Sequence, residues 1–278
     1  MFEGRPLAIA TMHKKESVIA PILETVLGVH CFTPYGLDTN TLGTFTGEIP
    51  RTLTPLEAAR QKCHAAMELS NCDLAVASEG SFGAHPNIPF LPANEELLVL
   101  VDKKNDVEIV VRELSITTNF NGEEVRTMAD LYAFAKRVNF PEHAIVLRDS
   151  RESNRAIHKG ITRYTELENF FTALLKKYGT AYAETDMRAM YNPTRMQVIQ
   201  AAANKLASKA LVCCPACDTP GFGVTATEGG LPCSYCSLPT KSVLHHVSTC
   251  TKCNYTSTKK YPTGKTTEDP QYCDYCNP

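Results

Sequence analysis

The last third of the chain contains four Cys-x-x-Cys pairs, a spacing typical of thiolate metal sites. In chain order, knuckles 1 to 4 are Cys214/Cys217, Cys233/Cys236, Cys250/Cys253 and Cys273/Cys276. Two knuckles supply the four thiolates of a closed tetrahedral zinc site, so the spacing predicts two structural zinc ions and no open catalytic position. This segment is poor in large apolar side chains, and zinc can replace its missing hydrophobic core.

The four knuckles can combine into two sites in three ways. We favour consecutive ribbons, in which knuckle 1 joins knuckle 2 and knuckle 3 joins knuckle 4, because each intervening loop is long enough for a strand pair. A cross-braced arrangement, in which alternate knuckles combine, is the rival. Cys213, His245 and His246 are expected not to be ligands.

A second group of residues that could bind a ligand or take part in catalysis lies in the first third of the chain. The apolar run Leu74–Ala77 follows Asp73 and is typical of a buried strand; Ser78-Glu79-Gly80-Ser81 follows the run. Glycine lets backbone approach a ligand closely, and ligands of open α/β sheets bind at the carboxyl ends of strands. Glu79, Gly80 and Ser81 are therefore predicted to face a ligand, with an ordinary polar turn as the alternative.

A cationic stretch follows an earlier apolar run, Leu7–Ala10. Thr11, His13, Lys14 and Lys15 precede a helical pattern that ends before Gly28. Cations at a helix N-terminus oppose the helix dipole. A bound phosphate or carboxylate would reverse that penalty, and unpaired backbone N–H groups would help to hold it. The alternative is that both lysines point into water.

The remaining patterns give the elements that would position these residues. Thr54, Pro55 and Glu57 form a helix start with a capping box, which offers Glu57 a structural role beside a catalytic one. The other expected elements are a hairpin of strands 96–101 and 107–111, a strand at 144–147, and helices at 127–138, 164–178 and 193–210. The order predicts an α/β fold, a mixed sheet with flanking helices, followed by a small two-zinc ribbon domain. The expected domains are 1–212 and 213–278.

Composition narrows the possible partners. The chain has 278 residues, with 28 basic and 30 acidic side chains, so no polyanion-binding surface dominates. No signal peptide or membrane-spanning run is evident, which predicts a cytoplasmic protein without a membrane partner. Lysines and tyrosines of the tail could meet nucleic acid, but a solvated ribbon surface is favoured; they are Lys241, Lys252, Lys259, Lys260, Lys265, Tyr255 and Tyr261.

Three stretches of the first third resemble the inosine/xanthosine triphosphate pyrophosphatase superfamily, which includes the Maf-like proteins. They are Ala10–Lys15, Glu57–Lys62 and Asp73–Gly80, and their order is the same as in that superfamily. The resemblance implies that Lys14 or Lys15 holds a triphosphate, that Glu57, Asp73 and Glu79 hold Mg²⁺ or activate water, and that Arg195 lies near the phosphates or base. His13 departs from the family's asparagine, and Gly83 stands where some members carry a second acid.

Two functions follow from these patterns. The first is a Mg²⁺-dependent hydrolase that releases pyrophosphate from a nucleoside triphosphate or a similar phosphorylated ligand. The second is a non-catalytic zinc-ribbon protein that binds nucleic acid or protein. The whole chain also resembles an uncharacterised bacterial family known only as a domain of unknown function, which implies no activity. The substrate and the oligomeric state stay open.

Overall fold

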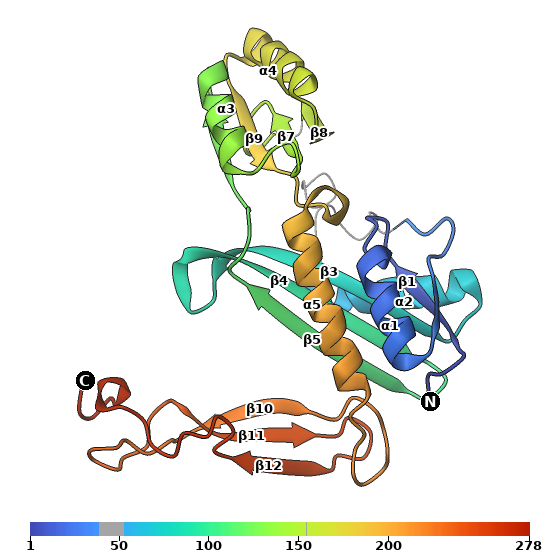
Figure 1. Ribbon diagram of the computed structural model, residues 1–278, viewed down its shortest axis with the longest axis vertical. Helices are drawn as coiled ribbons and strands as arrows, with labels where there is room; N and C mark the ends of the chain where they lie inside the picture. Colours follow the sequence, from blue (N-terminus) through green and yellow to red (C-terminus); the bar gives the residue numbers. More distant parts are fainter. Residues whose placement is uncertain (39–52, 154) are drawn as a thin grey trace. The chain divides into compact units, whose positions relative to one another are not determined.

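The computed structural model describes residues 1–38, 53–153 and 155–278. Contacts divide the protein into unit 1, Met1–Ala207, and unit 2, Ser208–Pro278 (Figure 1). Among the described residues, no helix combines the length and apolar character needed to cross a membrane.

The main sheet of unit 1 has the strand order β2-β1-β3-β4-β5. The strands are β1 (Pro6–Ala10), β2 (His30–Phe32), β3 (Leu74–His85), β4 (Ile88–Asp102) and β5 (Val107–Ser115). Strand β1 pairs in parallel with β2 and β3, whereas β4 pairs antiparallel with β3 and β5. The sheet is mixed, which confirms the predicted fold class.

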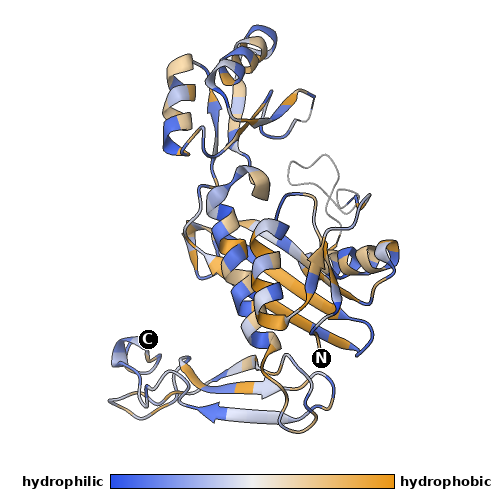
Figure 2. Ribbon diagram, turned by 45° about the vertical axis from the view of Figure 1, so that its right-hand side comes forward, coloured by the Kyte–Doolittle hydropathy of each residue, from blue (hydrophilic) through white to orange (hydrophobic). Residues whose placement is uncertain are grey.

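Three helices cover the two faces of this sheet: α1 (Glu16–Leu27), α2 (Pro55–Ser70) and α5 (Pro193–Ala210). Alternate strand residues such as Ala75 and Ala77 pack with Ala59 and Cys63 of α2 in one core cluster. Figure 1 shows α1 and α5 on the face opposite α2. The strands of this sheet are mainly apolar (Figure 2), because side chains on both faces are buried.

Strand β3 is longer than the sequence predicts. It continues through the polar stretch Ser78–Ser81, and β4 begins at Ile88, ahead of the strand expected at 96–101. The antiparallel ladder with β4 pairs Gly80 with Glu96 and keeps this polar stretch extended. A Cβ at Gly80 would collide with the side chains of Arg195 and Glu96, so this glycine makes room for a buried ion pair rather than a turn.

A second, antiparallel sheet in unit 1 has the order β6-β9-β7-β8. Its elements are β6 (Gly122–Val125), α3 (Met128–Arg137), β7 (Ile145–Arg148), β8 (Ile157–Ile161), α4 (Tyr164–Tyr178) and β9 (Ala181–Thr185). Leu147, Phe134 and Phe171 belong to its own hydrophobic core. The sequence predicts α3, α4 and β7 but misses the other three strands, which are short and offer no uninterrupted apolar run.

Unit 2 is built on the antiparallel sheet β10 (Val224–Gly229), β11 (Val243–Thr249) and β12 (Thr256–Lys260). Strand β12 lies between Tyr255 and Tyr261. The described residues also contain the 3-10 helices Ala189–Tyr191 in unit 1 and Pro270–Tyr272 in unit 2. Strands β10 and β12 are exposed throughout, and Figure 2 shows this sheet mainly in pale or hydrophilic colours.

Candidate metal centres and a candidate anion site

Three knuckles of unit 2 share one backbone turn. The residue after the second cysteine has a positive φ, 55° at Asp218, 63° at Ser237 and 58° at Asn254. Its N–H donates to the carbonyl of the first cysteine over 2.9–3.0 Å. Asn277 makes the equivalent bond to Cys273 over 2.8 Å in knuckle 4. This turn directs both cysteine side chains of a knuckle toward one point.

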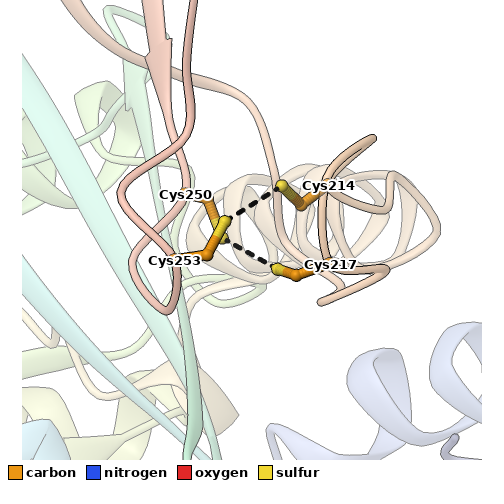
Figure 3. Close-up of side chains that lie close together, drawn as sticks. All are labelled: Cys214, Cys217, Cys250 and Cys253. Atoms are coloured by element: carbon orange, nitrogen blue, oxygen red, sulfur yellow. Dashed lines mark hydrogen bonds between the residues drawn. The ribbon is translucent and has the colours of Figure 1, made fainter.

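The eight sulfurs form two groups whose geometry fits zinc. Within each group the sulfur atoms all lie within 4.8 Å of one another. The closest contacts are Cys214–Cys253 and Cys217–Cys250, both 3.6 Å (Figure 3), and Cys233–Cys276 and Cys236–Cys273, 3.9 and 3.7 Å. A tetrahedron with Zn–S bonds of about 2.3 Å has sulfur–sulfur edges of about 3.8 Å. Two tetrathiolate zinc sites therefore fit this arrangement.

The pairing of the knuckles is cross-braced, so the favoured consecutive pairing is wrong. Knuckle 1 joins knuckle 3, and knuckle 2 joins knuckle 4. Knuckle 2 lies in the connection between β10 and β11, where a parallel bridge joins Cys233 to Glu268, shortly before knuckle 4. Cys213, His245 and His246 belong to neither group.

In unit 1, Lys15 lies at the carboxyl end of β1 and is buried, with 6% of its surface exposed. Its Nζ donates to Ser78 Oγ over 2.8 Å and to the Ser78 carbonyl over 3.3 Å. Thr11 is buried and its Oγ1 accepts a hydrogen bond from the His13 backbone N–H. The predicted loop therefore brings Lys15 to β3, while Lys14 stays exposed.

Two ion pairs lie close enough to Lys15 for their charges to act on it. Glu79 pairs with Lys62 of α2, and both side chains are largely buried. Arg195 of α5 pairs with Glu96 over 2.7 Å, and both of these side chains are fully buried. Arg195 also donates to the carbonyl of Met187. Removing one member of such a buried pair costs about 3–5 kcal/mol, because the other charge is left uncompensated.

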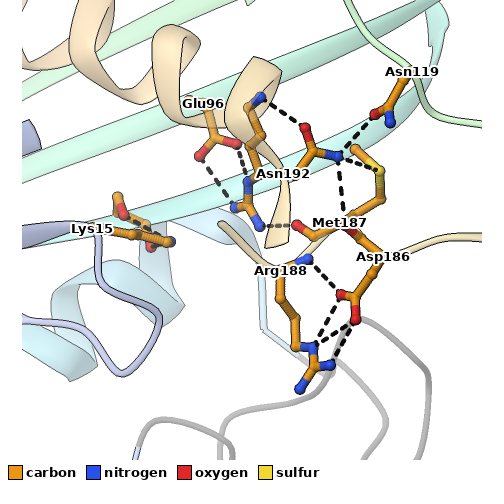
Figure 4. A network of polar contacts seen from close by, with 9 residues as sticks. Lys15, Glu96, Asn119, Asp186, Met187, Arg188 and Asn192 are labelled. Atoms are coloured by element: carbon orange, nitrogen blue, oxygen red, sulfur yellow. Dashed lines mark hydrogen bonds and ion pairs between the residues drawn. The ribbon is translucent and has the colours of Figure 1, made fainter. Parts of the chain in front are cut away.

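The polar network extends to the segments that enter and leave the second sheet (Figure 4). Arg188 donates to both carboxylate oxygens of Asp186. The Asn192 side chain donates to Asn119 Oδ1 over 2.8 Å and accepts from the Arg195 backbone N–H over 2.9 Å. These bonds tie α5, β4 and both connecting segments together.

Lys15, Lys62, Arg188 and Arg195 form what we call the cationic cluster. Burial, followed by the charge of Arg195, lowers the pKa of Lys15 to about 7. Burial also lowers the pKa of His13 to about 4, and the four charges of the cationic cluster add to this shift. The imidazole of His13 is therefore neutral at pH 7. Three of the four cations are paired with carboxylates: Lys62 with Glu79, Arg195 with Glu96 and Arg188 with Asp186.

The three predicted acids do not share a metal site. Glu57 forms the capping box with Thr54 at an exposed helix start. Asp73 pairs with Arg5 over 2.7 Å just before β3 begins, whereas Glu79 lies beyond the carboxyl end of β1. In the described parts of the chain, the groups of three or more histidine, cysteine or acidic side chains close enough to hold one metal ion are the two cysteine groups. The Mg²⁺ site expected from Glu57, Asp73 and Glu79 is therefore not formed.

Other predicted ligand residues have different roles from those expected. Ser81 is exposed on β3, and Gly80 is buried against the Arg195–Glu96 pair. Some backbone N–H groups at the start of α1 are not available to a ligand, because those of Ser17 and Val18 donate to the backbone carbonyls of Lys14 and Lys15. A phosphate there would depend on side chains more than on the helix start.

Sequence reasoning missed Lys62, Glu96 and Arg188. Lys62 ends a stretch that carries the family resemblance, and Glu96 is an acid at the head of an apolar run. A buried charge inside an apolar strand needs a partner, so Glu96 could have been identified as half of an ion pair. Arg188 gives no comparable signal, because only the packing of unit 1 brings it near His13.

The fold and the sites define a mixed α/β protein with a cross-braced, two-centre tetrathiolate module at its C-terminal end. The chain belongs to the family described as Domain of unknown function (DUF6671), whose model matches residues 62–278. No curated protein matches the chain. The family description names no activity, so the resemblance to the pyrophosphatase superfamily stays a prediction.

Proposed function

We propose that unit 1 binds a phosphorylated small molecule at the cationic cluster, and that unit 2 is held together by two structural zinc ions. The observation that carries the first part is the environment of His13. The four charges acting most strongly on this side chain are all positive, so a bound anion would interact favourably with each of them.

The resemblance supplies the more specific form of this proposal, in which the ligand is a nucleoside triphosphate and the reaction releases pyrophosphate. Glu79 is the predicted acid that lies beside the cluster, because it pairs with Lys62 and its charge acts on Lys15. Phosphoryl chemistry depends mainly on positioning and charge stabilisation, which such a cluster supplies.

Binding is tested by titrating the full-length protein with pyrophosphate in a calorimeter. Lys62→Gln should weaken binding by about tenfold or more, because a phosphate loses one ionic partner. Lys62→Arg keeps the charge and should restore binding. Lys104→Gln, an exposed lysine in the β4–β5 turn, is the matched control and should bind as the wild type does. Equal affinity for all four proteins contradicts the proposed site.

Turnover is tested by pyrophosphate release from a panel of ordinary and modified nucleoside triphosphates with Mg²⁺ in the buffer. Glu79→Gln should lower the rate by about 100-fold or more while the protein still binds pyrophosphate. Binding without release from any triphosphate would keep the ligand site and reject the hydrolase.

A further inference from the structure

The second metal centre presents exposed tyrosines at the tips of both of its knuckles. Tyr235 and Tyr275 each occupy the position just before the second cysteine, and they are 84% and 65% exposed. Tyr272, just before knuckle 4, is 61% exposed. The four sulfurs of this centre lie within 4.8 Å of one another, so the two knuckle tips flank a single metal position.

The first metal centre is an internal control for these tyrosines. Its knuckles make the same backbone hydrogen bonds, yet Ala216 and Lys252 stand at the equivalent positions. An aromatic ring is therefore not needed to form a knuckle or to hold the metal. Exposed aromatic side chains are characteristic of binding surfaces, where they supply a large contact area at low conformational cost.

The charges around the second centre select the kind of partner. Its surroundings contain the acids Glu268, Asp269 and Asp274. Each nearby lysine is matched by an acid, Lys241 by Asp274 over 2.8 Å and Lys265 by Glu268 over 3.3 Å, so these lysines add no net positive charge. Four thiolates also outweigh the charge of one Zn²⁺ ion. A phosphate backbone needs the opposite pattern, in which cations are available along its path.

We propose that Tyr235, Tyr272 and Tyr275, together with Asp269 and Asp274, form a docking surface for an arginine-bearing segment of a partner protein. A guanidinium group stacks on aromatic faces and donates paired hydrogen bonds to a carboxylate. The Lys241–Asp274 pair is exposed on both sides, 85% and 62%, so an incoming arginine replaces Lys241 at little cost. This surface belongs to unit 2 and is independent of the anion site.

The test uses the full-length, zinc-loaded protein and a fluorescein-labelled peptide of alternating arginine and glycine, followed by fluorescence anisotropy. Comparison probes are the same peptide with glutamate in place of arginine and a labelled oligothymidylate. The double variant Tyr235→Ala/Tyr275→Ala removes both rings, following the example of Ala216. Tyr235→Phe/Tyr275→Phe keeps the rings, and Tyr35→Ala removes a tyrosine of unit 1 that is 99% exposed.

The alanine variant should keep about two zinc ions per chain and bind the arginine peptide about tenfold more weakly or worse. The phenylalanine variant and Tyr35→Ala should bind as the wild type does. The proposal is overturned if the wild type does not bind the peptide, or if the alanine variant binds it equally well. Tyrosine-dependent binding of oligothymidylate in place of the peptide would also overturn it, in favour of a nucleic-acid partner.

Discussion

Lys15 is a residue whose chemistry depends strongly on its surroundings. In water a lysine is charged at all physiological pH values, but burial and the charge of Arg195 lower this pKa to about 7. Its Nζ donates hydrogen bonds to the hydroxyl and the carbonyl oxygen of Ser78, which are neutral acceptors. A bound anion would favour the charged form, so anion binding at this site should be coupled to uptake of a proton.

This coupling predicts that affinity falls with pH. The folded pKa of Lys15 is lowered, so the side chain is charged below about pH 7 and loses its proton above it. A ligand that prefers the charged form should bind up to about tenfold more weakly for each pH unit above 7. Sulfate is a suitable probe, because its own charge does not change between pH 6 and 9, and calorimetry measures its affinity.

Lys15→Met should abolish this slope and weaken binding at pH 6. Lys14→Met is the control, because Lys14 is the exposed neighbour in the same loop and should retain the slope. Protonation of His13 does not interfere, since its pKa of about 4 lies below the range. A slope that survives in Lys15→Met would show that another group takes up the proton.

Among the elements, the knuckles of unit 2 can each be recognised from the sequence. The sequence does not show which second knuckle completes each metal centre. Each knuckle is a local turn with its own hydrogen bonds, and any two of them could enclose a metal. The choice is made by strands β10 to β12 and by the bridge between Cys233 and Glu268, which bring alternate knuckles together.

Cross-bracing can be distinguished from consecutive pairing by counting zinc in double variants. Cys217→Ser/Cys253→Ser removes two ligands of one centre and should leave about one zinc per chain. Cys217→Ser/Cys236→Ser damages both centres and should leave about none. Consecutive pairing predicts the reverse result. Cys213→Ser, a change outside both centres, should keep about two zincs, and elemental analysis of the purified proteins gives the values.

At the scale of the whole molecule, the two units are stabilised by different forces. Unit 1 buries apolar residues in separate cores on both of its sheets. Unit 2 is described throughout, and apart from four cysteines its buried apolar residues are Ala210 and Leu231. Structural zinc contributes about 10–16 kcal/mol per site, enough to replace a hydrophobic core of this size.

Chelation should therefore unfold unit 2 and leave unit 1 folded. We expect amides of β10 to β12 to lose protection from hydrogen exchange after treatment with a strong chelator, while those of β3 to β5 keep theirs. Mass spectrometry of peptides from the full-length protein measures both at once. Re-addition of Zn²⁺ should restore protection. Loss of protection in β3 to β5 together with unit 2 would contradict separate stabilisation.

The sequence by itself determined the features that depend on neighbouring residues. The four knuckles, the capping box at Thr54 and Glu57, and the β4–β5 hairpin are set by local spacing, and all are present in the structure. The mixed α/β class follows from the same local patterns, because strand and helix periodicities can be read within short windows.

The tertiary structure alone decided which of these features meet. It placed Lys62 beside Glu79, buried Arg195 against Glu96, and separated Glu57 and Asp73 from the site. It also extended β3 through Gly80, since the ladder with β4 satisfies the backbone of a stretch that reads locally as a turn. Ion pairs and strand ladders join residues far apart in the chain, and their energies depend on burial and alignment that only the packed molecule provides.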